Sequence, residues 1–248
     1  MLNEQFTEEF AVAHTRLKKV FDPGRGGENP EDPITVQAMP IVLEIPKSTL
    51  PQRTELLEAA ARAVAATCLD PRAGQDTAYA EALGSWYGAR IRKVARRARN
   101  AAWERVQTLP GVTVEQGSAR ARAFVPSPVH LTDPLIGKLQ IGGTDLPIDE
   151  PGEVVPEIPL IGVDESLGMS VGKAAAQVGH ASMLLAAHMP LDWCHRWAEH
   201  GFVLQVRHLA ADDFSEWSGR ASAVPVRDAG YTEVAPGSMT VFADANGF

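Results

Sequence analysis

The sequence predicts an α/β protein built from a three-layer mixed sheet with helices on both faces. Two observations support this prediction. Short apolar runs with strand character alternate along the chain with longer segments of helical periodicity, which is typical of sheets covered by helices. The order of these segments in residues 39–142 also recurs in residues 157–245, which favours two tandem units arranged as a pseudo-dimer.

The second half of the chain gives the clearer succession of elements. An apolar run at 158–163 predicts a strand, and a Gly-containing turn then opens a predicted helix at 171–187. Beyond that helix the patterns predict a helix, a strand, a helix and two strands, at 191–200, 202–208, 212–218, 221–226 and 239–243.

The first half repeats this order in weaker form. A predicted strand at 39–45 and a predicted helix at 53–68 match the strand and helix that open the second half. Farther on, three further correspondences are expected: residues 122–126 with 221–225, Thr132 with Thr232, and Gly137 with Gly237. The alternative is that residues 1–140 form an unrelated α/β domain.

The expected domain boundaries follow from composition. Residues 1–38 hold an amphipathic helix at 4–21 and a connector rich in Gly, Pro and acids. Residues 143–156 have the same composition and are expected to link the two units, which then span residues 39–142 and 157–248.

Composition narrows the class of protein. The chain has 248 residues and 45% hydrophobic content, which is enough for a sizeable core. Its formal net charge of -8 is unlike that of a protein that coats nucleic acid. The two cysteines, Cys68 and Cys194, make no disulfide framework and indicate a reducing compartment. The sequence carries no signal pattern and no apolar stretch long enough to span a bilayer, so we expect a cytoplasmic protein.

Residues 89–106 are strongly basic. Alanines interleave with the charges, so we expect a basic amphipathic helix. Its cations are Arg90, Arg92, Lys93, Arg96, Arg97, Arg99 and Arg105. A solvated face paired with acids elsewhere and an electrostatic platform for a nucleic acid backbone are both compatible with this pattern.

Two segments carry chemistry. The first is GMSVGKAAAQVGHA at 168–181, and its helical spacing places Lys173, Gln177 and His180 on one face near a helix N-terminus. The second is DAGYTEVAPGSMTV at 228–241, which gathers a carboxylate and hydroxyls around a Pro-Gly turn: Asp228, Thr232, Ser238 and Thr240. A lysine, a histidine, a carboxylate and hydroxyls are the groups of a hydrolytic site, although each alone is also common in cores, caps and turns.

Together the two segments resemble the signature motifs of the type II peptidyl-tRNA hydrolases, over about residues 155–245. Two long motifs in the right order form a specific signal. The sequence departs from the family pattern at Val171, where a second lysine is usual, and at Tyr231, where an arginine is common. Both replacements remove positive charge from the surface that would face tRNA.

The resemblance implies hydrolysis of the ester between a peptide and the tRNA 3′ ribose, by a water nucleophile and without a metal or cofactor. Asp228 would orient or deprotonate the water and Lys173 would stabilise negative charge, with His180 and Thr232 completing the catalytic set. Substrate would be bound by Gln177, Ser238, Thr240, Arg90, Arg96 and Arg97. The partner would be tRNA, with no membrane.

Type II enzymes resemble one another in being homodimers, so a tandem duplication would place the same assembly in one chain, as a monomeric pseudo-dimer or a homodimer of it. The first unit would then be a scaffold or tRNA platform, since its chemistry is lost: Glu55, Ala59, Arg62 and Pro128 are expected opposite Lys173, Gln177, His180 and Asp228. The alternative function is a degenerate family member that binds tRNA, another ligand or a protein without turnover.

Overall fold

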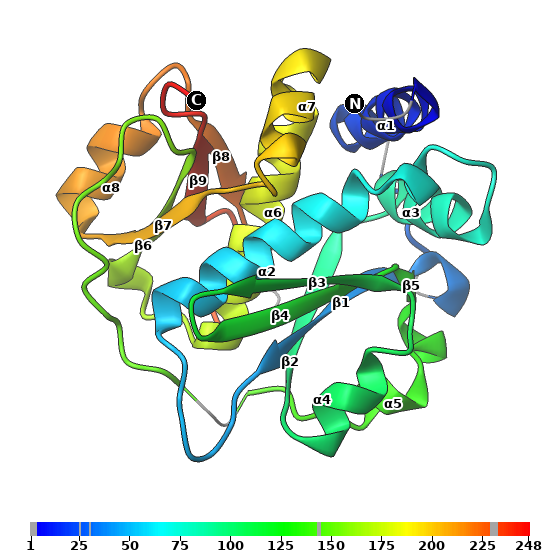
Figure 1. Ribbon diagram of the computed structural model, residues 1–248, viewed down its shortest axis with the longest axis horizontal. Coiled ribbons are helices and arrows are strands. Elements are labelled where there is room, and N and C mark those ends of the chain that lie inside the picture. Colours follow the sequence, from blue (N-terminus) through cyan, green and yellow to red (C-terminus); the bar gives the residue numbers. More distant parts are fainter. Residues whose placement is uncertain (1–3, 25, 30, 143–144, 229–232) are drawn as a thin grey trace.

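The computed structural model describes residues 4–24, 26–29, 31–142, 145–228 and 233–248, in which helices alternate with strands (Figure 1). The chain begins with α1 (Glu4–Leu17) and the short 3-10 helices η1 (Lys18–Phe21) and η2 (Pro33–Thr35). None of the helices in these described ranges is long and apolar enough to cross a membrane.

The first sheet and its helices occupy residues 37–137. In chain order they are β1 (Gln37–Glu44), α2 (Arg53–Cys68), η3 (Pro71–Ala73), α3 (Ala78–Gly88), β2 (Arg92–Ala98), α4 (Ala101–Val106), β3 (Gly111–Gln116), β4 (Ala119–Phe124), β5 (Ser127–Pro128), η4 (Val129–Leu131) and α5 (Pro134–Gly137). The strand order is β2-β1-β4-β3, with β5 also paired to β1. Only the β1–β2 pair among these is parallel.

The second sheet and its helices occupy residues 160–244. In chain order they are β6 (Leu160–Asp164), η5 (Glu165–Leu167), α6 (Val171–His188), α7 (Leu191–Glu199), β7 (Gln205–Leu209), α8 (Ala211–Ser218), β8 (Val224–Arg227) and β9 (Met239–Asp244). The strand order is β7-β6-β9-β8, again with one parallel pair, β6–β7. The predicted α/β class, with mixed sheets covered by helices on both faces, is confirmed.

Alternate side chains of each central strand point to different layers, because successive residues of a strand face opposite sides of the sheet. On the outer face of the first sheet, Val42 packs with Trp103 of α4 and Phe124. On the outer face of the second sheet, Leu160 packs with Phe214 of α8 and with Phe242. Helices α4, α5 and α8 therefore form the outermost layers.

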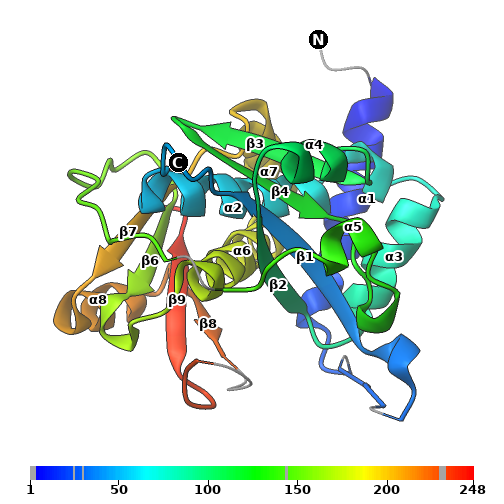
Figure 2. The same cartoon turned by 90° about the horizontal axis from the view of Figure 1, so that it is seen from below.

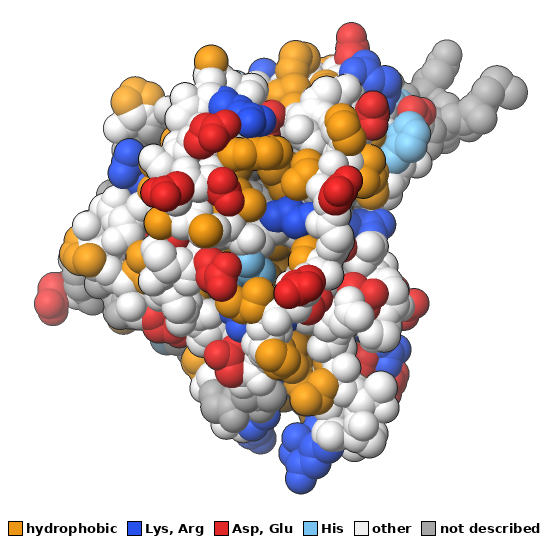
Figure 3. Space-filling view, turned by 90° about the vertical axis from the view of Figure 1, so that its left-hand side faces the viewer, with side chains coloured by type: hydrophobic (Ala, Val, Ile, Leu, Met, Phe, Trp, Pro, Cys, Tyr) orange, Lys and Arg blue, Asp and Glu red, His pale blue; other side chains and the backbone are white. Residues whose placement is uncertain are grey.

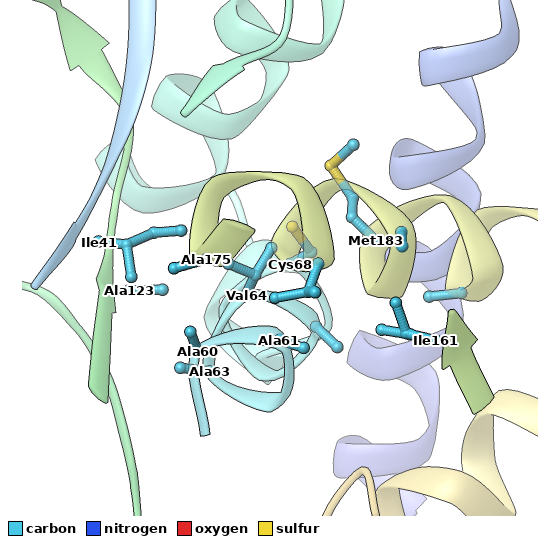
Figure 4. Close-up of a cluster of buried hydrophobic side chains, with 14 of the residues drawn as sticks. Ile41, Ala60, Ala61, Ala63, Val64, Cys68, Ala123, Ile161, Ala175 and Met183 are labelled. Atoms are coloured by element: carbon cyan, nitrogen blue, oxygen red, sulfur yellow. The ribbon is translucent and has the colours of Figure 1, made fainter. Parts of the chain in front are cut away.

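Between the two sheets lie α2 and α6, side by side (Figure 2). Both helices present small residues to each other, and the cluster is fully buried (Figure 4). Ile41 reaches it from the first sheet and Ile161 from the second. The hydroxyl of Ser182 donates to the carbonyl oxygen of Ala61 at 2.7 Å, which ties α6 directly to α2. One continuous core thus joins both halves of the chain.

The two halves share the same order of elements, the same strand order and the same strand directions. This arrangement is compatible with a tandem pseudo-dimer, and the duplication itself stays a prediction. In this connectivity β3 and β4 correspond to β8 and β9. The predicted match of 122–126 with 221–225 is therefore wrong, because 122–124 belongs to the strand that corresponds to β9.

The same shift changes what stands opposite Asp228. The position falls on the tight turn at Gly117 and Ser118 between β3 and β4, not on Pro128. The predicted match of Thr132 with Thr232 stays a prediction, because Thr232 lies outside the described residues. The two halves align differently from the prediction because their loops differ in length: the turn between β3 and β4 is short, whereas the connection between β8 and β9 spans residues 228–238. Glu55 on α2 accepts a hydrogen bond from the backbone N–H of Ser118 at 3.0 Å, so the first half also bridges its helix to this connection.

The predicted basic helix at 89–106 is wrong. Residues 92–98 form β2, which pairs in parallel with the buried strand β1, and only Ala101–Val106 is helical. Arginine and alanine favour helices by propensity, but pairing with a buried strand overrides a preference of a few tenths of a kcal/mol per residue. Asn100, with φ of 49°, separates the strand from α4.

The tightness of the α2–α6 contact is testable at two glycines of α6. A Cβ on Gly179 would lie 2.9 Å from Cγ2 of Val64, whereas a Cβ on Gly172 would lie 3.9 Å from Cβ of Ala95. We expect Gly179→Ala to lower the free energy of unfolding by about 1–3 kcal/mol through overpacking. Gly172→Ala should leave it unchanged or raise it by up to about 1 kcal/mol through helix propensity. Urea unfolding of both variants measures this, and a Gly179→Ala variant as stable as Gly172→Ala would contradict the packing.

Candidate functional site

The first turn of α6 is fixed by a cap and by a second segment of the chain. Gly168 adopts a left-handed conformation with φ of 55°, and Ser170 follows as the N-cap residue. The Ser170 hydroxyl accepts the backbone N–H of Lys173 at 3.2 Å and donates to Glu233 at 2.6 Å. The start of α6 is thereby held against the connection between β8 and β9.

Asp228 lies at the centre of a hydrogen-bonded network that joins α6 to this connection. Its Oδ2 accepts from Nζ of Lys173 at 2.6 Å and from Nε2 of Gln177 at 2.6 Å. The side chains of Lys173 and Asp228 are only 10% and 11% exposed, so their ion pair is largely shielded from water. A charge pair held this way is stronger than one on the surface.

Thr240 on β9 sets the orientation of Gln177. Its hydroxyl, fully buried, donates to Oε1 of Gln177 at 2.7 Å. With the amide oxygen engaged there, the amide nitrogen must face Asp228, where it donates. Thr240 therefore orients the Gln177 amide, which in turn bonds the Asp228 carboxylate, and Thr240 itself does not contact that carboxylate through these bonds.

The backbone around Asp228 forms a closed turn. Its N–H donates to the carbonyl oxygen of Ser238 at 2.9 Å, and its own carbonyl accepts the N–H of Gly237 at 2.7 Å. Gly237 has φ of 81°, a conformation that side chains disfavour, which explains the Pro-Gly pair in the sequence. Thr232, predicted to belong to the same set, lies outside the described residues.

His180 is placed one helical turn beyond Gln177, where it meets the first half of the chain. Its Nδ1 lies 3.0 Å from Nζ of Lys93, a residue of β2. A Cβ on Gly179 would lie only 3.3 Å from Cδ of Lys93, so this glycine leaves room for the lysine to reach His180. The candidate site therefore receives a residue that the sequence analysis had placed in a predicted basic helix.

Lys93 is buried next to uncharged side chains. Its Nζ lies 4.7 Å from the ring centroid of Trp86 and 3.6 Å from the sulfur of Met183. Burial lowers the pKa of Lys93 to about 7, and the nearby Cys68 opposes this only in part. Burial also raises the pKa of the Cys68 thiol to about 11 and that of Tyr87 well above its ordinary value, so both stay neutral near pH 7.

The arginines predicted to bind tRNA lie on and beside β2, and each has a partner. Arg90 lies 3.8 Å from Glu28. Arg96 donates to the carbonyl oxygen of Leu139 at 2.8 Å, and Arg97 donates to the side chain of Gln140. Arg96 and Arg97 bond neutral acceptors here and so keep their net positive charge. Neighbouring positions of a strand face opposite sides, so the two guanidinium groups lie on different faces of the sheet edge.

Val171, at the position where the family pattern has a lysine, is a buried apolar residue of α6, 2% exposed. Among the described residues, no group of three histidine, cysteine or acidic side chains is arranged to hold a metal ion.

The network lies within a region that matches a known family. Residues 159–244 match the family model described as peptidyl-tRNA hydrolase PTH2, which confirms the resemblance seen in the two sequence motifs. This region runs from β6 to β9 and includes Lys173, Gln177, His180 and Asp228. It leaves the first sheet outside the match. No curated protein and no solved structure matched the chain.

The buried Lys93 predicts a pH dependence of stability. Its amine titrates near 7 in the fold and near its ordinary value of 10.5 once unfolding exposes it. Between these values the unfolded chain binds more protons, so the free energy of unfolding attributable to Lys93 should rise with pH, by about 1 kcal/mol per pH unit.

Urea unfolding of wild type and Lys93→Met at pH 7, 8 and 9 measures this contribution. The wild type should gain stability relative to Lys93→Met as pH rises, while Lys138→Met, at an exposed lysine, should follow the wild type. Parallel curves for wild type and Lys93→Met would show that the Lys93 amine titrates normally.

Proposed function

We propose that the unit formed by β6 to β9 hydrolyses the ester bond between a peptide and the 3′ ribose of tRNA. The observation that carries the proposal is the convergence of Lys173 and Gln177 on the carboxylate of Asp228, inside the region that matches the peptidyl-tRNA hydrolase family. The ester is already an activated carbonyl, so its hydrolysis needs an oriented water and a stabilised oxyanion.

In this mechanism the Asp228 carboxylate orients a water and takes up its proton as the water oxygen attacks the ester carbonyl. The Lys173 ammonium, one turn into α6, stabilises the negative charge that develops on the carbonyl oxygen. Collapse of the tetrahedral intermediate breaks the bond to the ribose oxygen, which leaves as a hydroxyl by accepting the proton that Asp228 took from the water, and the peptide acid then ionises in solution. The peptide carboxylate and free tRNA are the products.

Gln177 and Thr240 position the carboxylate in this proposal. A buried hydroxyl does not touch a bound substrate, so we assign Thr240 to holding the Gln177 amide, and Gln177 to fixing the Asp228 carboxylate. The role of Ser238 is likewise to close the turn through its carbonyl oxygen. His180, bonded to Lys93, and Thr232 complete the proposed site.

The edge strand β2 is a suitable approach for the tRNA backbone. Ala95 lies closest to Gly172 at the start of α6, and Lys93 lies beside His180 farther along that helix. The strand therefore runs along α6 toward the turn that carries Lys173, and Arg97, two residues beyond Ala95, continues in that direction. We propose that Arg97 contacts a phosphate there, and that Arg96, on the other face of the strand, and Arg90, near its other end, contact phosphates farther along this edge.

We propose that the first sheet stands in for the second subunit of a homodimer. We propose that the chain is active as a single pseudo-dimeric molecule, with the first unit as scaffold and tRNA platform and with the unit boundaries expected from the sequence. A homodimer of the whole chain is the other assembly.

A binding module without turnover is the second candidate function. The burial of Val171 favours it, because the family lysine at this position is replaced by a side chain that packs into the core and offers no charge to a phosphate. The two functions make opposite predictions for hydrolysis but the same prediction for tRNA binding.

Release of labelled peptide from a peptidyl-tRNA by the purified chain tests the first function. We expect turnover by wild type and a fall in kcat of about 10²–10⁴-fold for Asp228→Ala, because general base action and its orientation are lost. Asp212→Asn, at an exposed acid of α8, is the matched control and should keep wild-type activity. Binding of tRNA without any release by wild type would establish the binding module instead.

The tRNA platform is tested by the salt dependence of binding. Removing two phosphate contacts should reduce the slope of log K against log salt by about 1.5–2, and leave kcat nearly unchanged. The variant is Arg96→Gln with Arg97→Gln, and the matched control is Arg196→Gln with Arg220→Gln, which removes the same charge from α7 and from the residues after α8. Equal slopes for the two variants would exclude a specific platform at β2.

A further inference from the structure

A cavity of about 280 Å³ lies between the two halves of the chain, next to the turn that enters α6. It opens beside the carboxyl ends of the parallel strands β6 and β7, where Val163 and His208 are paired neighbours. Ligands of α/β proteins commonly bind outside the carboxyl ends of parallel strands. The other walls are Arg53 of α2 and residues 145–148, in the segment between the sheets.

Two polar groups in the cavity wall have an atom without a partner among the described residues. Arg53 is 4% exposed, and its terminal nitrogens donate to Asp145 at 2.9 Å and to the Met169 carbonyl at 2.6 Å, yet its Nε–H donates to no acceptor. Nε2 of His208 is buried and also without a partner. A buried polar atom left in this state destabilises the fold unless water or a ligand satisfies it.

His208 is neutral near pH 7. Burial lowers the pKa of His208 to about 4, and the charge of Arg53 lowers it further than the nearby Asp149 raises it. The imidazole therefore presents a neutral ring nitrogen, which donates or accepts one hydrogen bond according to its tautomer.

The rest of the wall defines the charge of the ligand. Carboxylates of Asp145, Asp164 and Glu165 outnumber the single guanidinium, which is itself ion-paired with Asp145. Acidic side chains gather around this face of the molecule, over the second sheet and the segment that leads to it (Figure 3). An anionic ligand such as a nucleotide would meet repulsion here, whereas an ammonium group would be attracted.

The floor is apolar. Leu146 and Met169 are 2% and 5% exposed and line the cavity together with Val163. A ligand that satisfies every wall needs an ammonium group for the carboxylates, a carbonyl oxygen for the Arg53 Nε–H, and a small apolar group for the floor. The amino-terminal residue of a peptide carries these three groups on adjacent atoms.

We propose that this cavity binds the free amino end of a short peptide. As a peptide subsite of the enzyme the inference rests on the proposed function, since the cavity then receives the amino end of the peptide whose carboxyl end is esterified to tRNA. The placement suits this role, because Met169 lines the cavity and the next residue, Ser170, caps the helix that carries Lys173.

Binding is tested without tRNA, by titrating ¹⁵N-histidine-labelled protein with leucyl-glycinamide and following the ring signals by NMR. We expect the His208 signal, assigned by its loss in His208→Gln, to shift on binding. Acetylation of the peptide amino group should weaken binding about tenfold or more, because the ammonium is lost. Asp164→Asn with Glu165→Gln should weaken it severalfold, whereas Asp212→Asn with Glu216→Gln on α8 should not.

Three outcomes would overturn the inference: no binding of leucyl-glycinamide at millimolar concentration, equal binding of its acetylated form, or displacement of the dipeptide by adenosine, which would make the cavity a nucleobase site. The peptidyl-tRNA assay separates this inference from the proposed function. Dipeptide binding without hydrolysis would remove the hydrolase alone, and hydrolysis without dipeptide binding would remove the peptide subsite alone.

Discussion

The packing of α2 against α6 is the contact on which the rest of the molecule depends. Each helix covers the inner face of its own sheet, and each also forms the wall against which the other half packs. Small side chains allow the close approach, and the Ser182 hydrogen bond to Ala61 fixes the register between the helices. Neither sheet has a complete core without the helix of the other, so both halves act as one folding unit despite their two separate sheets.

This contact also makes the halves unequal in chemistry while they remain alike in topology. At corresponding helix positions stand Glu55 and Lys173, and each bonds the connection between the last two strands of its half. In the first half the partner is a tight turn, whereas in the second half it is a long connection that carries Asp228. Among the described residues, a helix lysine paired with a carboxylate of this connection is thus present in the second half alone. The other side contributes Lys93, which reaches across to His180.

Much of the fold could be predicted from the sequence, because its helices and strands carry strong local signals. The helix at 53–68 was predicted with the bounds that the structure gives, and the second half was predicted element by element. The prediction for residues 89–106 was wrong, because the alanines and arginines of this segment favour a helix locally and only pairing with β1 makes residues 92–98 a strand. The residue-by-residue alignment of the two halves was wrong because their loops differ in length, and the positions of the turns could not be predicted from the sequence.

For the candidate site too, residues within local motifs could be predicted, whereas contacts that depend on packing could not. Two motifs were enough to predict that Lys173, Gln177 and Asp228 belong to one set, and the structure brings these three together. The pairing of Lys93 with His180 joins residues 87 positions apart in the sequence. The cavity at Arg53 and His208 likewise depends on how the halves pack. No local pattern encodes such contacts, so they could not be found before the fold was known.

The shared core has a consequence for how the chain is made. Helix α2 emerges from a ribosome long before α6, whose last residue is His188, has been synthesised. Until then the alanine-rich face of α2 has no partner, and its apolar surface is exposed to solvent and to other nascent chains. Contacts between such distant segments also slow folding, because a long loop must close before they form. During translation the core of the first half therefore stays incomplete, and it reaches its final structure only after the second half has been synthesised.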